Sequence, residues 1–155
     1  MTTDLRRIAD DRMALHRDHK SSRPLSKDYE YIGLVGEKTL ADYLGLQIDT
    51  VLRPTGDGGV DLVCGHFRLD VKTARKPYNL IVERGKAFPN TIYVLAKYYD
   101  YEDRATLIGW EFGEAVRSAP CKDFGYGIIN HYIPAGDLRP MPELLQTLKN
   151  ESPKR

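Results

Sequence analysis

The chain has 155 residues, a length that fits one domain with a core of its own. Hydrophobic residues make up 41% of it and charged residues 29%, the balance of an ordinary soluble protein. The 23 basic and 22 acidic residues leave a net charge of +1, which excludes a strong overall positive field that would draw the protein onto nucleic acid.

No segment approaches the ~20 apolar residues of a membrane-spanning helix, and the first residues lack the apolar centre of a signal peptide. We therefore expect a cytoplasmic protein that makes no membrane contact. Cys64 and Cys121 stand apart in the sequence and form neither a disulfide framework nor a zinc-binding pattern.

The sequence predicts three parts. Residues 1–24 are expected to form a charged helical arm that ends at a Ser-Ser-Arg-Pro break. Residues 25–150 carry the apolar patterns of a folded domain, and residues 151–155 are expected to be a frayed, charged tail.

The first helix of the domain is predicted from Asp28, a good N-cap, to Leu44, with Gly45 as its stop. Glu37 lies on the apolar face of this helix, three, four and seven residues before Leu40, Ala41 and Leu44. A carboxylate on that face is costly unless something compensates it. Two explanations stay open: a functional carboxylate, or a salt bridge with a Lys or Arg at the edge of the apolar stripe.

Beyond this helix the pattern alternates between strands and helices. Strands are predicted over 60–64, 67–72, 91–98, 105–110 and 126–133, with a short helix over 111–118 and a last helix over 142–149. Together these elements predict an α/β fold with one central mixed β-sheet flanked by helices.

A tight hairpin is predicted where Gly65-His66 joins the first two of these strands. With a two-residue turn, Cys64 pairs with Phe67, and counting outward pairs Val63 with Arg68, Leu62 with Leu69, and Asp61 with Asp70. Because side chains alternate, one face becomes entirely apolar, with Val60, Leu62, Cys64, Phe67, Leu69 and Val71. The other face receives Asp61, Val63, Arg68, Asp70 and Lys72.

Asp61 and Asp70 would then face each other with Cβ atoms ~5 Å apart, and like charges so placed are destabilising. A divalent cation such as Mg²⁺ offsets this repulsion, because it takes carboxylate oxygens together with water and phosphate. Lys72 projects from the same face and can donate to a water molecule or a phosphate. The alternative is a surface face on which Arg68 and Lys72 simply neutralise the two aspartates.

These residues, in this order, resemble the PD-(D/E)xK nuclease superfamily over roughly residues 28–145. The resemblance rests on Glu37 in a helix, then Gly58-Gly-Val-Asp61, then Leu69-Asp-Val-Lys-Thr73. Val60 replaces the proline of the family name, which many members also lack. Asp70 stands where glutamate is more common, and it keeps the carboxylate.

The resemblance implies a restriction-endonuclease-like core and a Mg²⁺ site, with Mn²⁺ as a substitute. Asp61, Asp70 and the backbone carbonyl of Val71 would be the metal ligands, with Glu37 as a further ligand, direct or through water. Lys72 would be the catalytic lysine, acting with Glu37, Asp61 and Asp70.

The function expected from this resemblance is a metal-dependent (deoxyribo)nuclease that hydrolyses DNA phosphodiester bonds. Endonucleases of the Holliday-junction-resolvase type and of the phage type are two members of the superfamily that it could resemble. RNA is not excluded, and a homodimer is left open. Arg75 and Lys76 follow the motif within a basic segment and are candidate phosphate contacts, although a solvated loop explains them nearly as well. The alternative function is a catalytically inactive nucleic-acid-binding or assembly module with the same fold.

Overall fold

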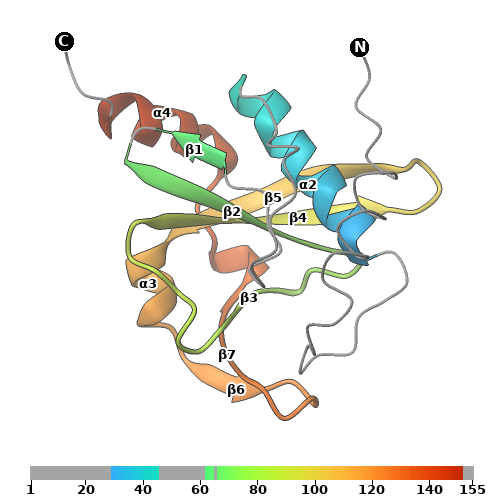
Figure 1. The fold of residues 1–155 in the computed structure, drawn as a ribbon, viewed down its shortest axis with the longest axis vertical. Helices are drawn as coiled ribbons and strands as arrows, with labels where there is room; N and C mark the ends of the chain where they lie inside the picture. The colour runs from blue at the N-terminus through green and yellow to red at the C-terminus, as the bar shows by residue number, and fades with distance from the viewer. Residues whose placement is uncertain (1–28, 46–61, 65, 152–155) are drawn as a thin grey trace.

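The structure, a computed structural model of the chain, describes residues 29–45, 62–64 and 66–151 (Figure 1). Within these ranges the main elements follow the order α2 (Tyr29–Leu44), β1 (Leu62–Cys64), β2 (Phe67–Ala74), β3 (Asn79–Glu83), β4 (Thr91–Tyr99), β5 (Arg104–Phe112), α3 (Gly113–Arg117), β6 (Cys121–Asp123), β7 (Ile129–Pro134) and α4 (Met141–Glu151). A short 3-10 turn, Ala135–Asp137, lies between the last two.

The described strands form two sheets. The first is a mixed sheet in the order β1-β2-β4-β5, in which β2 and β4 are parallel and the other neighbours antiparallel. The second is antiparallel, in the order β3-β7-β6. The sequence predicted a mixed sheet flanked by helices, which is confirmed, but its prediction of only one sheet is wrong. After β2 the chain leaves the mixed sheet, and the next strand, β3, pairs with β7 in the second sheet.

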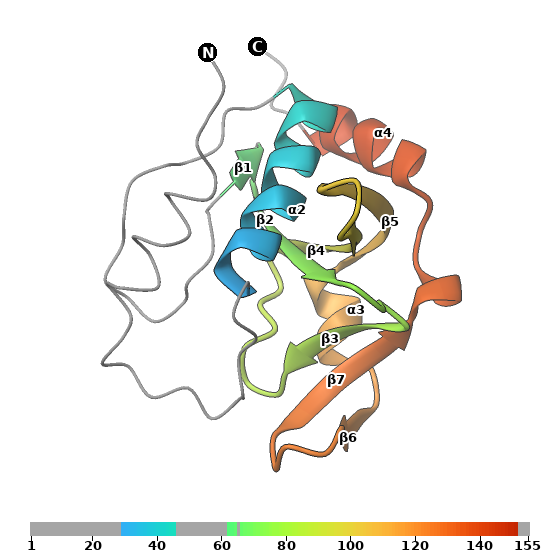
Figure 2. The ribbon, with the colours of Figure 1, turned by 90° about the vertical axis from the view of Figure 1, so that its right-hand side faces the viewer.

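The elements stack in three layers, as Figure 2 shows. Helices α2 and α4 cover one face of the mixed sheet, and the second sheet with α3 covers the other. The core on the helix side contains Leu34, Leu40, Leu69, Val71, Ile92, Val94, Trp110 and Leu144, among others. The core on the other side contains Leu80, Val82, Tyr93, Leu95 and Val116. Both faces of β4 are therefore buried, which explains its almost continuous apolar sequence.

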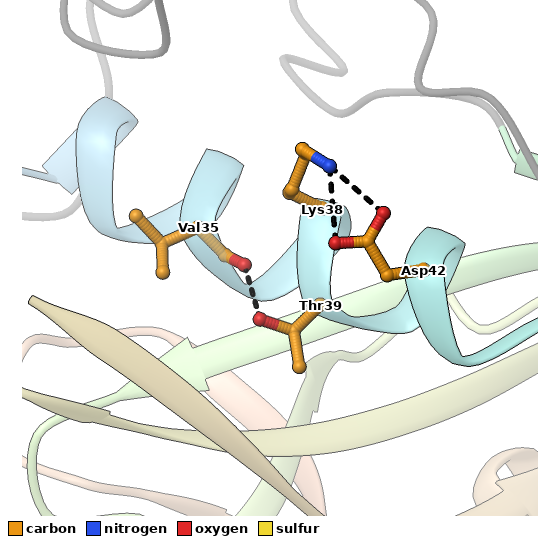
Figure 3. Close-up of polar contacts among 4 residues, drawn as sticks. All are labelled: Val35, Lys38, Thr39 and Asp42. Carbon is orange, nitrogen blue, oxygen red and sulfur yellow. Dashed lines mark hydrogen bonds and ion pairs between the residues drawn. The ribbon is translucent and has the colours of Figure 1, made fainter. Parts of the chain in front are cut away.

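Helix α2 ends where the sequence predicted, whereas its predicted N-cap, Asp28, lies outside the described residues. It ends at Leu44, and Gly45 follows with φ of +71°, the left-handed conformation that suits glycine after a helix. Its buried residues face the mixed sheet, while Lys38 and Asp42 form an ion pair with an Nζ–Oδ1 distance of 2.8 Å on the side away from the strands (Figure 3). The Thr39 hydroxyl donates to the Val35 carbonyl one turn earlier.

The start of α2 is tied to the turn between β4 and β5 by two tyrosines, the half-buried Tyr31 and the buried Tyr98. The hydroxyl groups of Tyr31 and Tyr98 both donate to the carboxylate of Asp103, at 2.7–2.8 Å. Asp103 has φ of +47°, so its backbone is left-handed although it is not glycine. Burial, together with the hydrogen bond to Asp103, raises the pKa of Tyr98. This contact fixes one end of α2 relative to the strands below it.

Helix α4 is positioned by Trp110, which is 1% exposed at the centre of the helix-side core. The Trp110 backbone pairs with Arg139, and its indole N–H donates to the Pro140 carbonyl at 3.0 Å. These contacts lead the chain directly into α4, whose predicted range was slightly shorter than the observed one. None of the helices in the described ranges is both long and apolar enough to cross a membrane.

The predicted strand over 126–133 is confirmed only from Ile129 onward. Before it, one oxygen of Asp123 accepts the backbone N–H groups of residues 125, 126 and 127, and Gly125 and Gly127 have positive φ. This closed turn prevents an earlier start of β7. The predicted N-terminal arm, residues 1–24, lies outside the described residues, and so does the predicted tail except for Glu151, which ends α4.

Candidate active site

The hairpin β1–β2 has the register that the sequence predicted. Cys64 pairs with Phe67, Val63 with Arg68, and Leu62 with Leu69. Residue 61 would be next in this series, but Asp61 lies outside the described residues, so its pairing with Asp70 stays a prediction.

The two faces of the hairpin differ as expected. Leu69 and Val71 are 2% and 8% exposed and belong to the core under α2. Val63 and Arg68 are exposed, and the side chains of Asp70 and Lys72 are each 41% exposed. Strand β2 therefore carries a continuous polar row on the face opposite α2.

Asp70 and Lys72 form an ion pair on this polar row. The Lys72 Nζ lies 3.3 Å from Asp70 Oδ1. Partial burial lowers the pKa of the Lys72 ammonium, but the charge of Asp70 and the hydrogen bond to it more than offset this, so the net pKa is raised above its ordinary value of 10.5. Lys72 is consequently a cation at neutral pH. In this pairing the ammonium can donate hydrogen bonds and stabilise negative charge.

This coupling predicts that Asp70→Asn lowers the pKa of Lys72, because the variant removes the main charge that raises it and leaves the effect of burial. The pKa is measured by following the Lys72 side-chain carbon in an NMR titration through alkaline pH. In the wild-type protein the ion pair stabilises the fold below pH 10.5, and this stabilisation is lost as the pH rises through the raised pKa. An unchanged midpoint in Asp70→Asn would show that the pair does not control the lysine.

Glu37 is buried, as its position on α2 predicted, and it is 7% exposed. Its helix packs over the face of β2 that carries Leu69 and Val71, whereas Asp70 and Lys72 leave β2 on the other face. The preceding residue, Gly36, meets the side chain of Thr73, and any Cβ at position 36 would overlap the Thr73 hydroxyl. Glu37 thus approaches the motif strand from the helix side, so joint action with Asp70 requires contact around the edge of β2.

At that edge of β2, a backbone carbonyl could bind the predicted metal ion. The N–H of Arg68 donates to Asn90 on the β4 side, so the backbone groups of Leu69 and Val71 point to the β1 side by alternation. Among the described residues, the pairs with β1 end at Leu69. The carbonyl of Val71 therefore points to the same edge that the predicted metal site would occupy.

The donor chemistry suits a hard cation. Asp70 offers a half-exposed carboxylate and Val71 a carbonyl, both oxygen donors of the kind that Mg²⁺ takes. Within the described part of the chain, no three or more His, Cys, Asp or Glu residues gather at one place. The predicted ligand set also needs Asp61, which lies outside that part.

Arg75 and Lys76, the predicted phosphate contacts, follow β2. The guanidinium of Arg75 donates from Nε to both carboxylate oxygens of Asp100, at 3.0 and 2.9 Å, and lies over the ring of Tyr98. Arg75 is thereby held against the β4–β5 hairpin. Lys76 is exposed.

Sequence reasoning missed the neighbour of Asp70 on the next strand. Tyr93 of β4 is the Cα partner of Asp70, and its hydroxyl accepts the backbone N–H of Phe88 and donates to the carbonyl of Lys86. Burial is the main cause that raises the pKa of Tyr93. The strand itself was predicted, but its parallel pairing with β2 leaves no local signal in the sequence.

Comparison of the chain with models of protein families, with curated proteins and with solved structures finds no match.

Proposed function

We propose that this protein is a metal-dependent nuclease that hydrolyses phosphodiester bonds in DNA. The observation that carries the proposal is the arrangement of β2: Asp70 and Lys72 lie side by side on a half-exposed face, while Val71 between them is anchored in the core. An acidic residue and a lysine cation two positions apart on a rigid strand can act on one phosphate. The register of the three described pairs, if continued by one residue, would pair Asp61 with Asp70, which supports Asp61 as their partner.

In this proposal Asp61, Asp70 and the carbonyl of Val71 hold the cation, with Glu37 as a further ligand. When bound, a divalent cation would neutralise the scissile phosphate and lower the pKa of a bound water. Lys72 stays protonated and donates to a phosphate oxygen or to the attacking water. Side chains alternate along β2, so Asp70 and Lys72, two residues apart, lie on the same face of the strand.

The fold supports the same assignment. Helix α2, which bears Glu37, precedes the antiparallel hairpin that bears Asp70 and Lys72, the order on which the resemblance to the PD-(D/E)xK superfamily rests. We therefore propose a restriction-endonuclease-like core for this domain. A structure-selective endonuclease, working as a homodimer in the cytoplasm, is the form of the activity that we propose to test.

The test is an incubation of the full chain with linear, plasmid and branched DNA and with RNA, in Mg²⁺, in Mn²⁺ and in excess EDTA. We expect cleavage of DNA with either cation and none with EDTA. Cleavage that persists in EDTA would overturn the metal mechanism. Binding of DNA without cleavage under any cation would favour the inactive binding module instead.

A further inference from the structure

A half-open pocket lies between the first turn of α2 and the end of β2. It is lined by Tyr29 and Ile32 from the helix and by Thr73, Ala74 and Arg75 from the strand and the residue after it, with a volume of about 200 Å³. Ile32 is 4% exposed and Tyr29 is 48% exposed, so the lining extends from the core to the surface. We call this the Tyr29 pocket.

The lining combines three kinds of group. Tyr29 supplies an aromatic ring, Ile32 and Ala74 supply apolar contact, and Arg75 supplies a guanidinium. Arg75 does not have to be ordered on binding, because its Nε already donates to both oxygens of Asp100. An aromatic wall beside a fixed cation suits a ligand that has a flat ring and a nearby negative charge.

The Tyr29 pocket borders the proposed active site. Three of its lining residues, Thr73 to Arg75, directly follow Lys72 along the chain. Thr73 leaves β2 on the helix side, where its side chain meets Gly36, and Lys72 leaves the strand on the other side. The phosphate of a nucleotide whose base fills the pocket would therefore reach Lys72 around the end of β2.

We propose that the Tyr29 pocket receives one unpaired nucleobase of the DNA, next to the phosphate that Lys72 contacts, with the base stacked on the ring of Tyr29. This inference rests on the proposed nuclease function and names its substrate class: DNA with an unpaired base beside the cleaved bond. The pocket is smaller than the 300–1,000 Å³ or so of ordinary ligand sites, so it suits a single ring system. A base within a duplex is stacked on its neighbours and paired with the opposite strand, so it must leave the stack before it can enter the pocket.

The test uses a DNA that the wild-type protein cuts at a defined bond, together with versions in which each nucleotide near that bond in turn is abasic. Affinity is measured by fluorescence anisotropy in Ca²⁺, so that it does not depend on activity. From the usual strength of base–aromatic stacking, we expect one abasic position to weaken wild-type binding about 5- to 150-fold. Tyr29→Ala should weaken binding of the intact DNA to a similar degree and show no further loss with that abasic DNA.

Two variants separate the pocket from general effects. Tyr29→Phe keeps the ring and should bind like the wild-type protein. Tyr43→Ala removes a tyrosine that is 40% exposed at the other end of the same helix, away from the pocket, and should leave affinity unchanged. The melting temperature of each variant confirms that α2 is intact.

The outcomes distinguish this inference from the proposed function. If the protein cuts DNA but the losses from Tyr29→Ala and from the abasic position simply add, the base does not occupy the pocket and the inference is overturned. If Tyr29→Ala binds the intact DNA as tightly as the wild-type protein does, the inference is also overturned. If the wild-type protein cuts no nucleic acid, the proposed function falls and this inference falls with it.

Discussion

Replacing Lys72 by alanine is expected to lower the single-turnover rate of DNA cleavage by a factor on the order of 10²–10³, the usual cost of losing one electrostatic contact to a transition state. The reason is that the Lys72 ammonium, beside Asp70 on the same exposed face of β2, can donate to the phosphate where negative charge develops. Its charge lies on a strand whose position is fixed by the buried residues Leu69 and Val71, which precede Lys72. DNA affinity in Ca²⁺ should change far less than the rate.

Two control variants make this result specific. Lys38→Ala breaks a comparable lysine–aspartate pair on the outer side of α2 and should leave the rate unchanged. Lys76→Ala, beyond the strand, should act in the opposite sense to Lys72→Ala by weakening affinity and reducing the salt dependence by about one phosphate contact. Rate and affinity are measured on one DNA at several salt concentrations. If Lys72→Ala cuts at the full rate, or loses affinity as much as rate, the proposed role of Lys72 is wrong.

Mg²⁺ is expected to stabilise the folded protein even without DNA, since a cation that binds only the folded state stabilises it by mass action. At a concentration a hundredfold above the dissociation constant, the gain is about 2.7 kcal/mol. For a chain of this size that gain corresponds to a rise in melting temperature of roughly 5–10 °C. Asp70→Asn, which removes a proposed ligand, should abolish most of the rise.

Asp42→Asn provides the matched control. Asp42 is also an exposed carboxylate paired with a lysine, but it lies on the outer side of α2 (Figure 3). The Mg²⁺-dependent rise should be retained in this variant, as measured by differential scanning calorimetry. An equal rise in Asp70→Asn and in the wild-type protein would place the cation away from β2.

The sequence predicted best where the physical signal is local. The register of the β1–β2 hairpin followed from a two-residue turn and strict alternation, and all three pairs that the structure describes agree with it. The end of α2 followed from the conformational freedom of Gly45. The burial of Glu37 followed from helical spacing alone.

Prediction failed where strand partners are distant in sequence. Strand β3, Asn79–Glu83, has alternate buried residues, but nothing in its own residues shows that it pairs with β7 in a second sheet. Strand β6 has three exposed residues and no apolar pattern. The Tyr29 pocket joins residues more than forty positions apart, so sequence spacing could not reveal it.

The residue at position 103 must adopt a left-handed backbone and must also accept two hydrogen bonds, and aspartate meets both requirements better than glycine or asparagine. Its left-handed backbone, with φ of +47°, would be most relaxed with glycine. Glycine, however, has no oxygen to accept the hydroxyl groups of Tyr31 and Tyr98. Asparagine tolerates the backbone, but as a neutral acceptor it would hold those hydroxyls less firmly than the carboxylate. A substitution that relaxes the backbone at this position therefore weakens the contact that holds the start of α2 to the β4–β5 turn.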